Sequence, residues 1–183
     1  MADSNITKKA LAEVMKNLLC TMPFSKISVS DICEACGMNR KSFYYHFKDK
    51  YDLVNWIFYT EFFETACSHP FENGWDFMQG ICDYFYANHS FYRKAFEISG
   101  QNSFRDYFRE MLEPILLQYS AEMFHSENPP EFFITFISDA YIISIIRWLS
   151  TKNCIEPTIY VQQLRSCSEI CIRNVSGNAG SCL

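Results

Sequence analysis

Residues 28–47 read SVSDICEACGMNRKSFYYHF, and this stretch decides the fold of the first third of the chain. Ser28 is followed three residues later by Asp31, which is the form of a capping box at the start of a helix. Gly37 interrupts the helical pattern, and Asn39 is a residue type that caps a second helix. The stretch therefore predicts two short helices with a glycine-containing turn between them, which is the spacing of a helix-turn-helix.

The residues around this stretch complete a three-helix unit. Apolar residues recur every three or four positions over residues 6–20, which predicts an amphipathic helix that ends before Pro23. A longer helix is expected over residues 51–67. The three helices are expected to share a small core made of Leu11, Val14, Leu18, Val29, Ile32, Met38, Phe43 and Phe47.

The second helix of the pair is expected to present a face that suits DNA. Its outward side chains are Arg40, Lys41, Ser42, Tyr44, Tyr45 and His46. Each is a donor to phosphates or base edges, or an aromatic group that packs against a sugar or a thymine methyl. The face carries three groups that are or can become cationic and no acid. This favours a helix that enters the major groove over a hairpin whose polar face is merely solvated.

The charge distribution agrees with a local DNA contact. The net charge of −5 argues against a protein that coats nucleic acid or an anionic membrane. Residues 1–55, however, carry eight Lys and Arg against six Asp and Glu, and so have a charge of +2, whereas the remainder has a charge of −7. Phosphate binding requires clustered cations and not a basic protein as a whole.

The sequence has nine cysteines at irregular spacing, and its first residues do not show the charged and then apolar pattern of a secretory leader. Reduced thiols in a cytoplasmic protein are therefore expected. Cys33 and Cys36 have the spacing of a zinc or redox pair, but a zinc site needs four ligands. Small buried packing residues are the favoured interpretation, with no metal and no cofactor, while metal binding and a redox switch stay open as alternatives.

Beyond residue 70 the chain is rich in aromatic residues and keeps a helical pattern. Helices are expected over residues 75–88, 90–97, 102–124, 131–151 and 157–174. Pro114 is expected to kink or split the third of these. The predicted fold is all-α: a three-helix helix-turn-helix DNA-binding domain in residues 1–50, joined by the helix 51–67 to a helical effector-binding and dimerisation domain in residues 68–183.

The helix expected over residues 131–151 is apolar nearly all round, so every side of it must be covered. One face is expected to meet its own core and another a second subunit. The residues expected at this dimer interface are Ile142, Ile145, Ile146, Leu149, Leu164 and Cys171. The alternative is a central core helix in a monomer. No membrane span is expected, because Asp139 and Arg147 interrupt the apolar run.

The aromatic residues of the same part also allow an effector pocket. Those expected to enclose it are Trp75, Tyr84, Tyr107, Phe108, Phe136 and Tyr141. An apolar cavity with a few placed polar groups is how ligand sites are usually built. Simple core packing is the competing interpretation, and a partner protein in place of a small molecule is another. The four histidines are scattered, no catalytic arrangement stands out, and an enzyme is not expected.

The run KISVSDICEACGMNRKSFYYHFKDKYDLVNWIF, residues 26–58, resembles the signature of TetR/AcrR regulators. The matching features are a small residue before Gly37, the run of residues 44–47 that reads YYHF, and Lys50 at the start of the next helix. The resemblance covers about the first 60 residues. With the short C-terminal half, the chain is similar to the subgroup that includes regulators of dihydroxyacetone kinase operons.

This resemblance implies a homodimer on a palindromic operator, in a family made mostly of ligand-released repressors with some activators. By position, it implies that Lys41, Ser42 and Tyr45 face bases. It implies that phosphates are held by Ser28, Tyr44, His46 and Lys50. Cys33, Cys36 and Arg40 depart from the family pattern.

Overall fold

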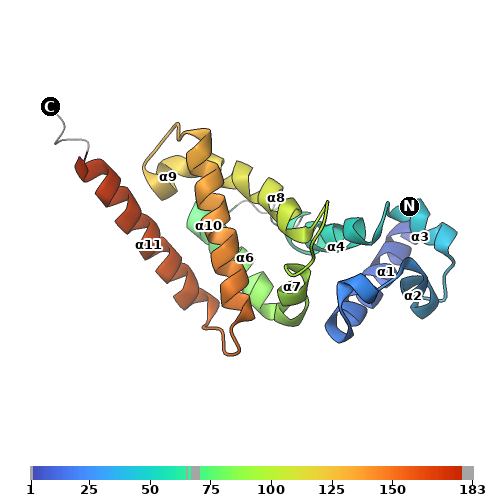
Figure 1. Ribbon diagram of the computed structural model, residues 1–183. Coiled ribbons are helices and arrows are strands. Elements are labelled where there is room, and N and C mark those ends of the chain that lie inside the picture. Colours follow the sequence, from blue (N-terminus) through green and yellow to red (C-terminus); the bar gives the residue numbers. More distant parts are fainter. Residues whose placement is uncertain (1, 65, 67–70, 179–183) are drawn as a thin grey trace. The chain divides into compact units, whose positions relative to one another are not determined.

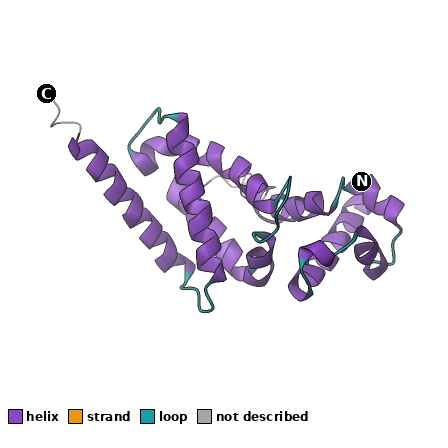
Figure 2. Cartoon of the chain, in the orientation of Figure 1, coloured by secondary structure: helices purple, strands orange, loops and turns teal. Residues whose placement is uncertain are grey.

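The computed structural model describes residues 2–64, 66 and 71–178, with side chains for residues 4–64, 66 and 71–170. Every regular element in these residues is helical, which confirms the predicted all-α class (Figures 1 and 2). The chain divides into two units. One is made of residues 1–69 and 88–107, and the other of residues 70–87 and 108–183. The segment 88–107 thus groups with the N-terminal unit, although it follows the boundary expected near residue 68.

The first unit is an array of short helices around α1. Its elements are α1 (Ala2–Thr21), the 3-10 turn η1 (Phe24–Lys26), α2 (Val29–Ala35), α3 (Arg40–His46), α4 (Lys50–Phe58), the π-helical turn η2 (Tyr59–Phe63) and α7 (His89–Ala95). The α1 helix contacts α2, α3, α4 and α7. The helix expected over residues 51–67 is α4 followed by the π-helical turn, and its expected end at Cys67 lies outside the described residues.

The core of this unit buries four of the eight apolar residues expected there. Leu11, Ile32 and Phe43 are completely buried, and Phe47 is 3% exposed. Val14, Leu18, Val29 and Met38 are only half-buried. Full burial of a leucine- or phenylalanine-sized side chain stabilises a fold by about 1.5–3 kcal/mol. This core is therefore what holds two seven-residue helices in place, since helices of that length do not persist alone in water.

The second unit is made of longer helices. They are α6 (Gly74–Ala87), α8 (Phe104–Gln118, which starts in the first unit), α9 (Ser120–Phe124), α10 (Glu131–Ser150) and α11 (Pro157–Asn178). The α6 helix contacts α9, α10 and α11. Gly74 begins α6 against α9, where a Cβ would collide with Met123 and lie 2.8 Å from Tyr119 Cβ. Only glycine permits this approach.

The helix expected over residues 102–124 is interrupted, but not at its proline. Pro114 lies inside α8, and the break comes at Tyr119, between α8 and α9. Proline removes one backbone hydrogen bond, and here the rest of the helix continues past it. The turn at Tyr119 allows α9 to bury Met123 and Phe124.

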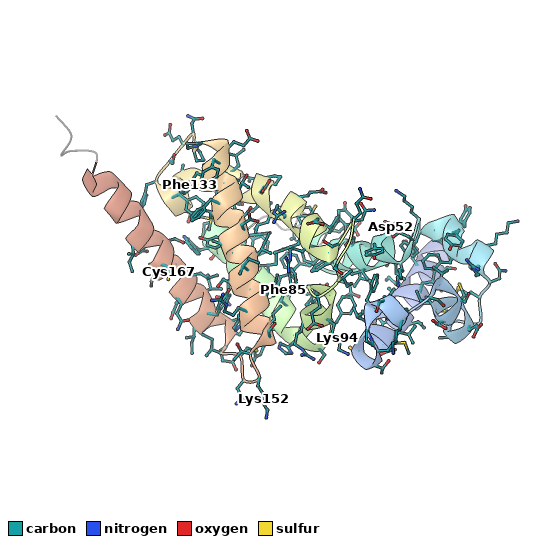
Figure 3. The ribbon with its side chains drawn as sticks, in the orientation of Figure 1. Asp52, Phe85, Lys94, Phe133, Lys152 and Cys167 are labelled. Carbon is teal, nitrogen blue, oxygen red and sulfur yellow. The ribbon has the colours of Figure 1, made fainter. Side chains whose placement is uncertain are left out.

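Stacked aromatic rings join the helices of the second unit. Trp148 of α10 lies between Tyr160 of α11, at 4.4 Å between ring centres, and Tyr86 of α6, at 6.1 Å. The Trp148 indole N–H donates to the Ile155 carbonyl at 2.8 Å. Figure 3 shows Phe85 among these helices, whereas Lys152 projects from the loop after α10. The aromatic residues therefore fill the interior of this unit.

The α10 helix is long and apolar enough, by length and composition alone, to cross a membrane. Core helices of soluble proteins meet the same criterion, and 44% of the relevant stretch of α10 is buried inside the protein. Ile142, Ile145 and Leu149 are the most deeply buried, at 0–1% exposure. The apolar character of α10 is thus explained in part by the core that it completes.

Candidate DNA-binding surface

The α2 helix begins with the capping box expected from the sequence. Ser28 Oγ accepts from the Asp31 backbone N–H at 3.2 Å, and Asp31 Oδ2 accepts from the Ser28 backbone N–H at 2.8 Å. Ser28 Oγ also donates to Asp31 Oδ2 at 2.8 Å. The hydrogen bond from the Ser28 backbone holds the pKa of Asp31 below its usual value. The Ser28 hydroxyl is therefore engaged beside a carboxylate, a setting that disfavours the phosphate contact implied by the resemblance.

The turn between α2 and α3 depends on Gly37, as expected. Its φ is +64°, the left-handed region, and a Cβ at this position would meet nothing within 4 Å. The requirement for glycine is therefore conformational and not steric. Met38 N–H donates to the Cys33 carbonyl at 2.8 Å, which closes the turn. Asn39 Oδ1 then accepts from the Ser42 N–H at 2.9 Å and caps α3.

One face of α3 is anchored in the core and the other faces water. Phe43 is completely buried, so the residues on the opposite side of this helix point outward. Arg40 and Lys41 are exposed, and Tyr44 and Tyr45 are exposed by 50% and 83%. Ser42 and His46 are half-buried, with the His46 ring 4.9 Å from that of Tyr45. The structure thus brings the expected cationic and aromatic groups onto one seven-residue helix without an acidic neighbour in that helix.

Lys50 is held inside the first unit. Its Nζ donates to the carbonyls of Phe24 and Ile27, both at 2.7 Å, and lies 4.2 Å from the centre of the Phe24 ring. Burial lowers the pKa of Lys50. Two of its three N–H groups are therefore committed to the loop before α2. This structural role of Lys50 depends on a contact with residues 24–27, which are distant in the sequence. Sequence reasoning therefore missed it.

The Cys33 and Cys36 thiols pack against the core of the first unit. Cys33 is 2% exposed, and Cys36 Sγ lies 3.6 Å from the Ala10 carbonyl of α1. Burial raises the pKa of both thiols above the ordinary value, so the neutral form is favoured. No cluster of three metal-ligating side chains occurs among the described residues. The positions therefore fit the packing interpretation.

The residues expected around an effector pocket differ in burial. Trp75 and Tyr141 are buried and their rings lie 6.5 Å apart, while Phe108 is buried 5.3 Å from the Phe85 ring. Tyr84 is half-buried, and Tyr107 belongs to the first unit. The expectation that Phe136 lines an interior pocket is corrected, because Phe136 is 59% exposed on the outer side of α10. A helical position five residues before Tyr141 points away from the core that Tyr141 enters.

The expected dimer interface also changes. Ile142, Ile145 and Leu149 are 0–1% exposed and Leu164 is 8% exposed, so these four belong to the core of their own chain. Ile146 is half-buried, and the side chain of Cys171 lies outside the described residues. Among the side chains described up to residue 170, the exposed large apolar residues of α10 and α11 are Phe132, Phe136, Ile143, Ile159 and Ile170. A helix that is apolar all round gives no period from which the sequence can select this face.

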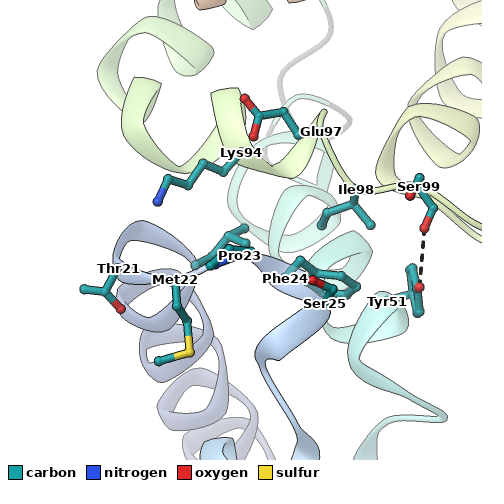
Figure 4. A pocket seen from close by; sticks show the side chains of 11 residues that line it. Thr21, Met22, Pro23, Phe24, Ser25, Tyr51, Lys94, Glu97, Ile98 and Ser99 are labelled. Atoms are coloured by element: carbon teal, nitrogen blue, oxygen red, sulfur yellow. Dashed lines mark hydrogen bonds between the residues drawn. The ribbon is translucent and has the colours of Figure 1, made fainter.

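Two of the surface hollows lined by described residues bear on the search for a ligand site. One, of about 300 Å³, lies in the first unit between the end of α1 and the end of α7 (Figure 4). At this hollow Lys94 Nζ donates to the Cys20 carbonyl at 2.9 Å, and Tyr51 Oη donates to the Ser99 carbonyl at 3.4 Å. Its lining includes both Lys94 and Glu97, so it does not select for one sign of charge. The other is a shallow hollow of about 380 Å³ on α10, lined by Phe136, Asp139, Ala140, Ile143, Ser144 and Arg147.

An all-α chain with a capped helix-turn-helix and a basic, aromatic second helix has the architecture of a DNA-binding regulator of transcription. The family model described as "Bacterial regulatory proteins, tetR family" matches residues 17–57, and the one described as "Transcriptional regulator C-terminal region" matches residues 72–169. The chain therefore belongs to the TetR family of bacterial regulatory proteins, as its helix-turn-helix sequence predicted.

Individual relatives agree with this assignment. The chain is 29% identical, over 80% of its length and 81% of the relative, to the HTH-type dhaKLM operon transcriptional activator DhaS of Lactococcus lactis subsp. lactis. The solved structure of a dihydroxyacetone kinase operon activator DhaS matches with a TM-score of 0.65 at 23% identity, covering 92% of this chain and 97% of that one. A TetR transcriptional regulator from Streptococcus agalactiae matches with a TM-score of 0.73 at 20% identity, covering 91% and 96%. The two structures show the likeness of fold.

Proposed function

We propose that the protein is a homodimer that binds a near-palindromic operator, with one α3 helix in the major groove of each half-site. The observation that carries this proposal is the outward face of α3, where Arg40, Lys41, Tyr44 and Tyr45 are exposed. Recognition helices related by a two-fold axis read half-sites about 34 Å apart, one turn of the duplex. Because the operators of bacterial regulators lie in the cytoplasm, we propose that the protein acts there. An enzymatic activity is not part of the proposal.

The dimer is proposed to form through the outward face of α10. Phe132, Phe136 and Ile143 are exposed by 79%, 59% and 44%, and the first two rings are stacked 6.4 Å apart. Phe136 and Ile143 line the shallow hollow of this helix. A second copy of the chain would cover these groups, in keeping with a family whose members dimerise.

Repression that is relieved by a small molecule bound in residues 68–183 is the first regulatory proposal. The alternative is an activator or adaptor whose C-terminal part binds a partner protein. One observation supports this alternative: the 29% identical relative is described as an operon activator. The buried contact between Trp75 and Tyr141 also points to a packed interior at one of the places where a pocket was expected.

Selection of bound duplexes from a random pool tests the DNA-binding proposal. The full chain is expected to enrich a symmetric motif, with an affinity that falls steeply as salt rises, because cations of the protein displace counterions from phosphates. The Lys41→Ala and Tyr45→Ala variants should relax the base preference. A pool in which no symmetric sequence is enriched contradicts the proposal.

A further inference from the structure

Arg40 in the first turn of α3 and Tyr44 in the second form a contact that has no role in the proposal above. Arg40 Nη2 donates to Tyr44 Oη at 3.4 Å, and the guanidinium carbon of Arg40 lies 5.8 Å from the centre of the Tyr44 ring. Residues four apart lie on the same face of a helix. The pair therefore stands on the outward face of α3, and both residues are exposed.

The core determines where Tyr44 lies. Its ring meets the ring of Phe43 edge-on, with centres 5.5 Å apart, and Phe43 is completely buried. Tyrosine has only two side-chain torsions, so a ring that is packed on one side has little freedom left. Tyr44, which is 50% exposed, thus offers Arg40 a ring surface and a hydroxyl on a side chain that packs against the core along one edge.

Arg40 keeps most of its hydrogen-bonding capacity in this arrangement. Tyr44 engages one of the five N–H groups of a guanidinium. Within the described part of the chain, no carboxylate forms an ion pair with Arg40. The planar fork is therefore held in one region and is still available to an external acceptor.

We infer that Arg40 reads a guanine in each operator half-site and that Tyr44 is its positioning residue. This inference rests on the proposed function. A guanidinium donates two parallel hydrogen bonds to O6 and N7 of guanine in the major groove. The N-terminal residues of a recognition helix are the ones that contact base edges, and Arg40 is the first residue of α3. A phosphate accepts the same fork, so the experiment must separate the two acceptors.

The test compares duplex selections for the full-length wild type and Arg40→Ala. The wild type is expected to enrich guanine at one pair of symmetry-related positions, and replacement of that G·C pair should weaken binding about 5- to 150-fold per half-site. Arg40→Ala should keep the rest of the motif and lose the preference at that pair alone. Lys152→Ala removes an exposed lysine in the loop after α10 and is the matched control, with the preference unchanged.

The role of Tyr44 is tested with two further variants. Tyr44→Phe keeps the ring and removes the hydroxyl, and Tyr44→Leu removes both. The guanine preference should fall in the order wild type, Tyr44→Phe, Tyr44→Leu, with the unfolding temperature of Tyr44→Phe unchanged. A purely structural role would instead weaken binding to all duplexes alike.

Two results would overturn the inference in distinguishable ways. If Arg40→Ala weakens all duplexes equally and lowers the salt slope by about 0.9 for each lost contact, Arg40 binds phosphate and reads no base. If the wild type enriches no symmetric motif, the operator proposal fails and the inference fails with it.

Discussion

The α3 and α10 helices both expose aromatic side chains, but the neighbouring side chains are polar on α3 and apolar on α10. On α3, Tyr44 and Tyr45 carry hydroxyls and stand beside Arg40 and Lys41, so water solvates this face well in the free protein. On α10, the exposed groups are phenyl rings and an isoleucine, for which burial is worth about 1.5–3 kcal/mol per side chain.

The difference indicates two kinds of partner. A polyanion replaces water on the face of α3 by hydrogen bonds and ionic contacts, whereas only an apolar surface improves on water at α10. The same chain thus has one face that is stable when free and another that gains by association. Substitutions in α10 and α3 test this distinction, and a third set tests the packing beneath the DNA-binding unit.

The largest effect is expected from glutamate substitutions at two positions of α10 that lie two residues apart, Ile143 and Ile145. Ile145 is completely buried, and Ile145→Glu should destabilise the fold by about 3–5 kcal/mol because it leaves an uncompensated charge in the core. Ile143 is 44% exposed, and Ile143→Glu should convert dimers to folded monomers that lose only the stability that association provides. Denaturant unfolding and sedimentation measure the two outcomes. A stable monomeric Ile145→Glu, or a dimeric Ile143→Glu, would contradict the assignment of faces.

A smaller effect is expected from replacing Lys50 at the start of α4, compared with the same replacement of Lys41 on α3. Lys50→Met removes hydrogen bonds to the Phe24 and Ile27 carbonyls and should cost about 1–2 kcal/mol of stability. The salt slope of DNA binding should stay unchanged, because the ammonium is committed within the protein. Lys41→Met is the matched control and should weaken operator binding with no loss of stability. A reduced slope for Lys50→Met would show that Lys50 holds a phosphate, as the family resemblance implies, and would contradict a purely structural role.

The smallest effect is expected at the cysteine pair. Cys33→Ala/Cys36→Ala should bind the operator nearly as the wild type does and should lose about 1 kcal/mol of stability, since only two small groups are removed. Burial raises the pKa of both thiols, so at pH 7 they are less ionised than ordinary thiols and should alkylate more slowly. Metal analysis checks the pair: zinc bound by the wild type and absent from the variant would refute the packing role.

The sequence predicted the recognition unit well because its determinants are local. Ser28, Asp31, Gly37 and Asn39 act on backbone groups within three residues of themselves, so a single pass along the chain locates both helices. The outward face of α3 followed from the burial of Phe43 between polar neighbours.

The parts that could not be predicted depend on contacts between distant residues. The ammonium of Lys50 meets carbonyls 26 and 23 residues earlier in the chain, and no local pattern encodes that contact. On α10, apolar residues occur on every side, so the pattern could not assign Phe136 to the surface or Ile145 to the core. The break at Tyr119, five residues after Pro114, likewise follows from how α9 packs.

The stacking of Trp148 between Tyr86 and Tyr160 has a spectroscopic consequence. The chain has three tryptophans, of which Trp148 and Trp75 lie in the second unit and Trp56 in the first. Trp56 is half-buried, with the ammonium of Lys8 5.5 Å from its ring, whereas Trp148 is 5% exposed within its stack. Their fluorescence emission therefore arises in environments of different polarity. A chain that keeps only Trp56 or only Trp148 reports on one unit at a time, so two parallel titrations compare the ligand concentration at which the DNA-binding unit changes with that at which the other unit changes.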